Sequence, residues 1–212
     1  MKRNLSIISY LLLCILSLSA QTNKATDSKV KYQNYLKELK SGNSEIDYLD
    51  FRNSFYDSGQ VLLAMQASDS IKIYRIKGLE QLNNKKFAEA EASFKRSLQD
   101  NYTDPEIHFF LSFVHHLQGN EKEQNLHRSI SEGLQKTILE SGDGKTPETA
   151  YKVNMVTEEY ALLRLMRAKT LKQTLTSSTP VCDLMEVEIN GQKENIYFDI
   201  TRVMETYKQI FK

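Results

Sequence analysis

A weak internal repeat constrains the fold of this chain more than any other feature of its sequence. Gly78 and Ser112 lie 34 residues apart, and similar residues surround each of them. A period of this length is typical of repeats built from a pair of helices, in which each pair buries its apolar face against its neighbour. The middle of the chain is therefore predicted to be a stack of helical hairpins, an architecture that presents surfaces and rarely performs chemistry.

Small and apolar residues stand where such a hairpin requires them. In the first unit, Tyr74 and Gly78 belong to the first helix, residues 83–85 form the turn, and Ala90 and Phe94 belong to the second helix. Gly78 and Ala90 are predicted to lie at the helix crossing, because larger side chains would push the helices apart. The unit resembles a tetratricopeptide repeat through these residues: Tyr74, Gly78, Phe87, Ala90, Phe94 and Leu98.

The second unit follows the pattern only in its first helix. Asp104 is predicted to cap that helix and Pro105 to occupy its first turn. Half of a second unit is recognisable in Leu111, Ser112 and Gly119-Asn120, but Gln124 and Arg128 replace the small and aromatic residues expected in the next helix. Two units are fewer than the three that such stacks usually need. Flanking segments are therefore expected to cover the open ends.

A β-hairpin is predicted near the C-terminus. Residues 182–189 and 193–200 read as strands joined by Asn190-Gly191, the strongest short hairpin signal. Counting outward from this turn places Glu188 opposite Lys193 on one face and Met185 opposite Ile196 on the other. Opposite charges and apolar groups then meet on separate faces, which supports this register.

The whole chain is predicted to be an α+β protein, mostly helical with tetratricopeptide-like hairpins and a small C-terminal antiparallel sheet with flanking helices. A third strand is expected at residues 150–153, followed by a helix capped by Thr157 that runs to about Leu171. The expected organisation is a signal peptide at 1–20, N-terminal helices at 21–70, helical hairpins at 71–140 and an α+β module at 141–212. We expect this module to pack on the repeats, so that the whole forms one compact domain.

The C-terminal third carries a second resemblance. Four short segments are similar to a family of small secreted bacterial proteins, the domain-of-unknown-function family numbered four-nine-one-nine: SGDGK at 141–145, ETAY at 148–151, EEY at 158–160 and IYFDI at 196–200. The resemblance implies export and a shared fold. It implies no activity, because the family has none assigned.

The N-terminus reads as a secretory signal. Lys2 and Arg3 precede an apolar stretch at residues 7–18, and Ala20 ends a small-residue cleavage site. The stretch is too short to span a membrane, which takes about 20 residues. A lipid anchor at Cys14 is not expected, because the residue before it is leucine rather than a small residue. We therefore predict export to the periplasm or the cell surface.

Charge and cysteine content exclude some classes of function. Without residues 1–20, the chain keeps 26 of its 28 basic residues against 27 acidic ones. A near-neutral chain lacks the concentrated positive charge that nucleic acids require. No later segment is apolar enough to cross a membrane. Cys182 is then the single cysteine, so no internal disulfide can form.

No catalytic or metal-binding constellation emerges from residue spacing, so no cofactor is predicted. No two of the four histidines, His108, His115, His116 and His127, have the four-residue spacing of helical metal ligands. They are interpreted as core or surface histidines. Glu158 and Glu159 point about 100° apart on a helix, so they are interpreted as complementing the helix dipole. The segment Gly144-Lys145-Thr146 lacks the earlier glycine of a phosphate-binding loop, because Leu139 stands there.

The inner groove of the repeats is the remaining candidate site. By resemblance to tetratricopeptide units, it is expected to hold the following residues: Lys72, Arg75, Leu79, Phe109, Phe113 and His116. Such a groove is apolar with a basic edge and would suit a protein or peptide. Leu79 and Phe113 stand where carboxylate-clamping units have asparagine, so a clamp of that kind is not expected. The alternative is that the chain's own N-terminal helices or C-terminal module fill the groove.

We therefore expect a non-enzymatic interaction or accessory module of the bacterial envelope. One alternative is a hydrolase of envelope polymers that uses Asp143, His127 or Glu158 brought together by folding. The other is a structural or dimeric scaffold, and the oligomeric state is left open.

Overall fold

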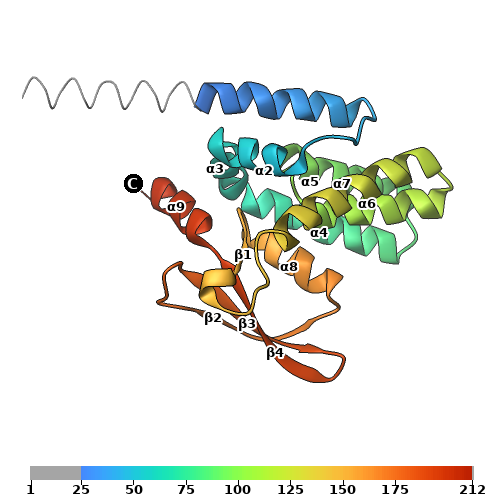
Figure 1. The fold of residues 1–212 in the computed structure, drawn as a ribbon. Coiled ribbons are helices and arrows are strands. Elements are labelled where there is room, and N and C mark those ends of the chain that lie inside the picture. The colour runs from blue at the N-terminus through green and yellow to red at the C-terminus, as the bar shows by residue number, and fades with distance from the viewer. Residues whose placement is uncertain (1–24, 212) are drawn as a thin grey trace, which may run out of the picture.

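Helices build most of the chain in the computed structural model, which describes residues 25–211 (Figure 1). The expected signal peptide lies outside these residues. After a helix at residues 25–40, the helices are α2 (Tyr48–Asp57), α3 (Gln60–Gln66), α4 (Ser68–Asn83), α5 (Phe87–Asp100), α6 (Pro105–Gln118), α7 (Glu121–Leu139), α8 (Val156–Leu165) and α9 (Thr201–Ile210). Within residues 25–211, no helix combines the length and the apolar character that a membrane crossing requires.

The two expected helical hairpins are present as α4–α5 and α6–α7, and α5 packs on α6. Asp104 caps α6 by accepting hydrogen bonds from the backbone N–H groups of Glu106 and Ile107, as expected. Gly119 ends α6 in the left-handed conformation at φ 73°. The close crossing at Gly78 is also confirmed, because a Cβ added there would lie 2.5 Å from the ring of Phe94.

The sheet has four strands in the order β1-β4-β3-β2: β1 (Tyr151–Lys152), β2 (Lys169–Leu175), β3 (Cys182–Ile189) and β4 (Gln192–Asp199). The hairpin β3–β4 has the expected register, with Glu188 opposite Lys193 and Met185 opposite Ile196. Asn190 and Gly191 both have positive φ, as this tight turn requires.

The sheet differs from the expected three-stranded antiparallel one in two ways. β1 runs parallel to β4, so the sheet is mixed. β2 occupies part of the segment where the helix was expected to continue to Leu171. That helix ends at Leu165, and Arg167 then adopts the left-handed conformation at φ 55°. Thr157 does not cap it, because the helix begins one residue earlier and its first turn has no side-chain cap.

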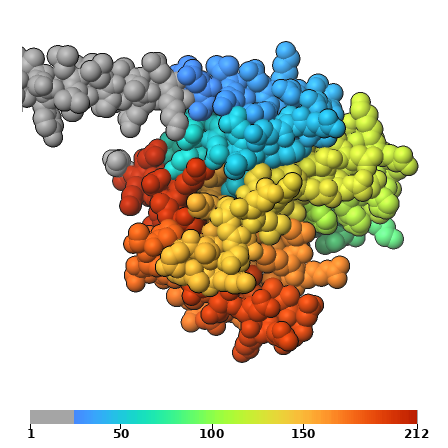
Figure 2. Space-filling view, viewed as in Figure 1, coloured from blue at the N-terminus to red at the C-terminus, as the bar shows by residue number. Residues whose placement is uncertain are grey.

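Two apolar clusters hold these elements together. The smaller lies among α4, α5 and α6 and includes Phe94, whose ring stacks on Phe110 at a centroid distance of 5.4 Å. The larger joins the N-terminal helices to α7, α8, α9 and the inner face of the sheet, with Phe51, Leu134 and Phe198 fully buried. Figure 2 shows the resulting contact on the surface, where the segment around residues 140–150, in yellow, lies between the N-terminal helices and the C-terminal strands.

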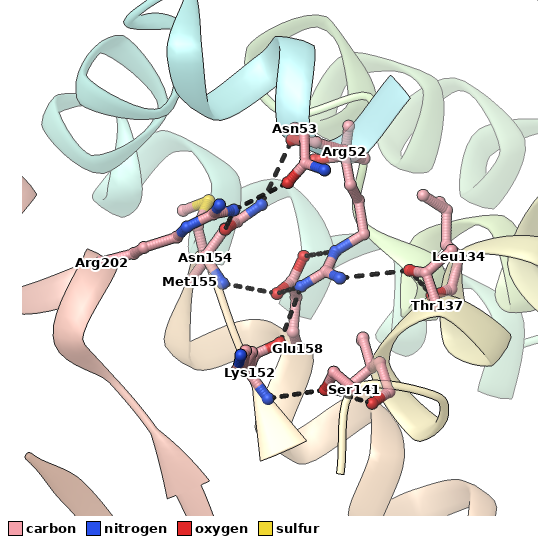
Figure 3. Close-up of polar contacts among 12 residues, drawn as sticks. Arg52, Asn53, Leu134, Thr137, Ser141, Lys152, Asn154, Met155, Glu158 and Arg202 are labelled. Atoms are coloured by element: carbon pink, nitrogen blue, oxygen red, sulfur yellow. Dashed lines mark hydrogen bonds and ion pairs between the residues drawn. The ribbon is translucent and has the colours of Figure 1, made fainter. Parts of the chain in front are cut away.

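A buried ion pair crosses this larger core (Figure 3). Arg52 of α2 donates from Nε and Nη2 to the two carboxylate oxygens of Glu158 of α8, at 3.0 and 2.8 Å. Its Nη1 donates to Thr137 of α7 at 3.1 Å, and Nη2 also donates to the backbone carbonyl of Lys152 in β1 at 3.0 Å. One guanidinium group therefore joins α2 to three elements that lie 85 to 106 residues later in the chain.

The residues around the ion pair complete its hydrogen bonds. The backbone N–H of Asn154 donates to Glu158 at 2.7 Å, and the side-chain amide of Asn154 donates to the carbonyl of Arg52 at 3.3 Å. Arg202 of α9 donates to the side-chain oxygens of Asn53 and Asn154 at 2.9 and 3.0 Å. Glu158 thus binds a distant arginine, a role that the helix-dipole interpretation missed.

Gly78→Ala tests the close helix crossing. Replacing glycine by alanine inside a helix normally stabilises it by about 1 kcal/mol. Here the new Cβ would meet the Phe94 ring, and overpacking a core costs about 1–3 kcal/mol. We therefore expect urea denaturation to give a lower free energy of unfolding for this variant. The exposed neighbouring substitution Lys77→Ala should change it by less than about 0.5 kcal/mol. A more stable Gly78→Ala protein would contradict the close packing.

Arg52→Met tests the buried ion pair. The substitution leaves the Glu158 carboxylate buried without its guanidinium partner, which typically costs about 3–5 kcal/mol in the free energy of unfolding. The matched control is Lys31→Met, which removes the Lys31–Asp50 pair, whose side chains are 54% and 35% exposed. Exposed pairs contribute about 0–1 kcal/mol. Equal losses in urea denaturation of the two variants would refute the structural role of Arg52.

Candidate functional site

The structure divides the six residues of the expected groove. Phe109, Phe113 and His116 line neighbouring cavities on α6. Lys72 is exposed on α4 and lines neither of them. Leu79 is partly buried against the smaller apolar cluster. The groove is therefore centred on α6 and not on α4.

The main cavity lies among α6, α7 and α8 and has a volume of about 370 Å³. Phe109, Ala161 and Leu165 supply apolar surface to its wall. Three arginines also line the cavity, Arg128, Arg164 and Arg167, together with two glutamates, Glu106 and Glu132. A smaller cavity of about 190 Å³, which Phe109 shares with Phe113 and His116, lies beside it. We call the two cavities together the α6 groove.

Glu106 anchors one wall of the α6 groove and is 3% exposed. It accepts a hydrogen bond from Arg75 of α4 at 2.8 Å and one from Nε of Arg164 of α8 at 2.6 Å. The guanidinium of Arg164 also lies over the ring of Phe110, 5.4 Å from its centroid. Helix α8 of the C-terminal module therefore forms part of the wall of the groove.

Two aromatic rings of the groove stay open to solvent. Phe109 is 48% exposed and Phe113 is 45% exposed, although both belong to a helix whose other face is buried. They lie four residues apart, about one turn, and so share one face of α6. The chain's own residues therefore fill only part of the groove, and the rest is open to solvent.

A buried acid lies beneath the groove, next to Glu106. Asp104 is 1% exposed, and one of its carboxylate oxygens has no partner within residues 25–211. Burial, reinforced by the negative charge of Glu106 and partly opposed by Arg75, raises the pKa of Asp104 to about 7. Asp104 does not line the cavity.

Three of the four histidines come together on the other side of the α6–α7 hairpin. His127 of α7 contacts His108 through their Nδ1 atoms at 2.8 Å and stacks on His115 at a centroid distance of 5.6 Å. Glu123 lies beside them, and one ligand atom from each of His115, Glu123 and His127 falls within 4.8 Å of the others. Spacing among histidines alone could not reveal this, but Glu123 and His127 are four residues apart and share a helix face.

The residues of the hydrolase alternative have separate partners. Asp143 is exposed and accepts hydrogen bonds from Thr149 and from the backbone of Lys145, as expected of a turn residue. Glu158 is buried in its ion pair with Arg52, and His127 contacts two other histidines. Among residues 25–211, no hydrogen bond or ion pair joins any two of Asp143, His127 and Glu158.

Within the described part of the C-terminal module, Glu159 is the acidic side chain whose pKa is shifted furthest from its usual value. It is fully buried, and neither carboxylate oxygen has a hydrogen-bond partner within the described chain. Burial, together with the nearby carboxylates of Asp183 and Glu158, raises its pKa to about 9. Glu159 is therefore protonated and neutral at pH 7.

Glu159→Gln tests this protonation. The unfolded chain releases the Glu159 proton near pH 4.5, whereas the folded chain keeps it until about pH 9. The folded state binds the extra proton between these values, so the free energy of unfolding falls as pH rises through this window. The glutamine variant lacks this contribution. We expect it to gain stability relative to wild type as pH rises from 5 to 8, by up to about 1.4 kcal/mol for each pH unit.

Chemical denaturation between pH 5 and pH 9 measures this difference, with the exposed substitution Glu194→Gln as control. The pH slope of the free energy of unfolding should be shallower for Glu159→Gln and unchanged for Glu194→Gln. Identical slopes in all three proteins would show that Glu159 is ionised when folded.

Comparison with known proteins assigns the chain to a family. No curated protein and no solved structure matches it. A family model described as a domain of unknown function (DUF4919) matches residues 19–209. The match covers every helix of the α6 groove, the histidine cluster and the sheet, including the 141–145 and 196–200 segments on which the sequence resemblance rests. The chain therefore belongs to the DUF4919 family.

Proposed function

We propose that the protein is a non-enzymatic interaction module whose α6 groove binds a peptide segment of another protein. The proposal rests on one observation. Two half-exposed rings, Phe109 and Phe113, line a cavity of about 370 Å³ and its smaller neighbour. Apolar anchors that enter a preformed pocket dominate the affinity of most protein interfaces. The groove thus offers a seat for one or two apolar side chains of the partner.

The charged side chains of the groove determine which residues of the partner peptide would flank its apolar side chain. Three arginines line the main cavity against two glutamates, and one of these, Glu106, is already bound by Arg75 and Arg164. Arg164 uses only Nε for Glu106, which leaves its two terminal nitrogens for a ligand. Guanidinium groups bind carboxylates in a two-pronged geometry. The preferred segment therefore carries an apolar side chain next to aspartate or glutamate.

The proposed groove binds a carboxylate through other residues than the carboxylate clamp of tetratricopeptide units. That clamp relies on asparagine, and this chain has Leu79 and Phe113 at the corresponding positions. Here the carboxylate-binding groups come from α7 and from the C-terminal module. The α8 helix is thus part of the binding surface and not only a cover for the repeats.

The site of action in this proposal is the cell envelope. Support comes from the signal-like segment at residues 1–20. The family match begins at residue 19, next to the expected cleavage site. The presented groove then faces other exported proteins.

Selection from a random peptide display library tests the groove. We expect the enriched peptides to combine an apolar side chain with acidic neighbours. The double variant Phe109→Asp/Phe113→Asp should bind these peptides at least about tenfold more weakly by fluorescence anisotropy, a loss of about 1.4 kcal/mol in binding free energy. Both rings are half-exposed, so circular dichroism and thermal unfolding should stay close to wild type.

The matched control is Leu63→Asp on α3, which alters a leucine that is 54% exposed and far from the groove in sequence. It should keep wild-type peptide affinity. If the double variant binds the selected peptides as tightly as wild type, the groove is not the site. If it fails to fold, the rings serve packing instead. A stable dimer of wild type, seen by light scattering and lost in the double variant, would favour the scaffold alternative.

A further inference from the structure

We propose that His115, Glu123 and His127 form a binding site for a divalent transition-metal ion of the zinc class. His115 belongs to α6, and the other two residues lie one turn apart on α7. The site is on a different face of α6 from the groove residues Phe109 and Phe113, so it does not depend on the proposed peptide binding. It stands on three observations.

The first observation is a hydrogen-bond chain that sets the tautomer of His127. His108 Nε2 lies 2.9 Å from the carbonyl oxygen of Tyr102, which can only accept, so this nitrogen carries the proton. The Nδ1 atom of the neutral His108 ring is then an acceptor. His127 Nδ1 therefore donates to it, at 2.8 Å, and its Nε2 keeps a free lone pair.

Burial fixes both rings in this arrangement. His108 is 0% exposed and His127 is 4% exposed, so bulk water does not compete for the hydrogen bonds of their ring nitrogens. Metal-binding histidines commonly donate their second ring N–H to a fixed acceptor, which orients the ring and raises its basicity. Here His108, held by the Tyr102 carbonyl, provides that acceptor for His127.

The second observation is an unpartnered ring. His115 is 2% exposed, and neither of its nitrogens has a hydrogen-bond partner within residues 25–211. Leaving a buried polar group unpaired costs about 1–3 kcal/mol. A metal ion bound between His115 and His127 would satisfy this otherwise costly group.

The third observation is the carboxylate of Glu123, which completes a two-histidine, one-carboxylate set. All three ligand atoms lie within 4.8 Å of one another. Tetrahedral zinc with bonds of about 2.1 Å separates its ligands by about 3.4 Å. The ligand atoms therefore need to approach one another by at most about 1.4 Å for zinc to bind. Two nitrogen ligands favour zinc-class ions over Ca²⁺ and Mg²⁺, which prefer oxygen ligands.

The site has a route to solvent. Glu123 and His127 line a cavity of about 320 Å³ between α7, α5 and the N-terminal helix. Two lysines, Lys40 and Lys95, line the same cavity. Lys95 is neutralised by Glu91 at 2.7 Å, and Lys40 lies over the ring of Tyr102. An ion can thus enter from this cavity, and three protein ligands leave a further coordination position for water.

Isothermal titration of the chelator-treated, purified protein with ZnCl₂ tests the site. We expect saturable binding of one ion per chain, a rise in the unfolding temperature with Zn²⁺, and visible absorption typical of four-coordinate Co²⁺ when cobalt replaces zinc. Glu123→Gln alters a half-buried residue and should keep the fold while weakening binding at least tenfold. His115→Phe keeps the volume of the ring and should abolish the thermal shift by Zn²⁺.

Two substitutions serve as controls for ion binding elsewhere. His116→Ala removes an exposed histidine next to His115, and Glu132→Gln removes an exposed glutamate of the same helix as Glu123. Both should bind Zn²⁺ like wild type. The proposal is overturned if wild type shows no saturable binding of Zn²⁺ or Co²⁺. It is equally overturned if Glu123→Gln and His115→Phe bind Zn²⁺ as tightly as the two controls.

Discussion

The buried ion pair between Arg52 and Glu158 is the interaction on which the rest of the structure depends. A guanidinium group removed from water is tolerated only when its charge and donors are satisfied, and the partners of Arg52 come from α7, β1 and α8. The pair therefore fixes α8 against the N-terminal helices. Because α8 also carries Arg164, the same interaction positions the guanidinium that holds Glu106 and forms part of the wall of the α6 groove. A core contact thus determines the shape of a surface site.

Local sequence signals predicted the elements that depend on local physics. The Asn190-Gly191 turn, the Asp104 cap and the contact between Gly78 and Phe94 each require only neighbouring residues or one adjacent helix, and each is present. Strand β2 could not be found in this way, because all its residues are exposed and no apolar alternation marks it. Its lysines suit an edge strand, where charge discourages pairing with other chains.

The part of the candidate site on α6 could be predicted from the sequence, whereas the parts that come from other helices could not. The repeat positions predicted Phe109 and Phe113 as groove residues, and both are half-exposed on α6. The arginine wall comes from α7 and from α8 with the residues after it, for which the repeat pattern carried no information. Glu158 was misinterpreted because a helix dipole explains an acidic first turn, while its actual partner lies 106 residues away. The histidine cluster could not be found from histidine spacing because His115 lies on α6 and His127 on α7, although Glu123 and His127 have the required helical spacing.

The contacts between α2 and α9 have a consequence for the order in which the chain reaches its native state. Tyr56 donates to Glu205 at 2.7 Å, and Arg202 both lies over the Tyr56 ring and donates to Asn53. Since 149 residues separate the members of each hydrogen-bonded pair, the first helices cannot acquire their final neighbours until the last helix has been synthesised. The apolar face of the first helices therefore gains its native cover only at the end of synthesis, so the native state forms after the chain is complete and not step by step from the N-terminus.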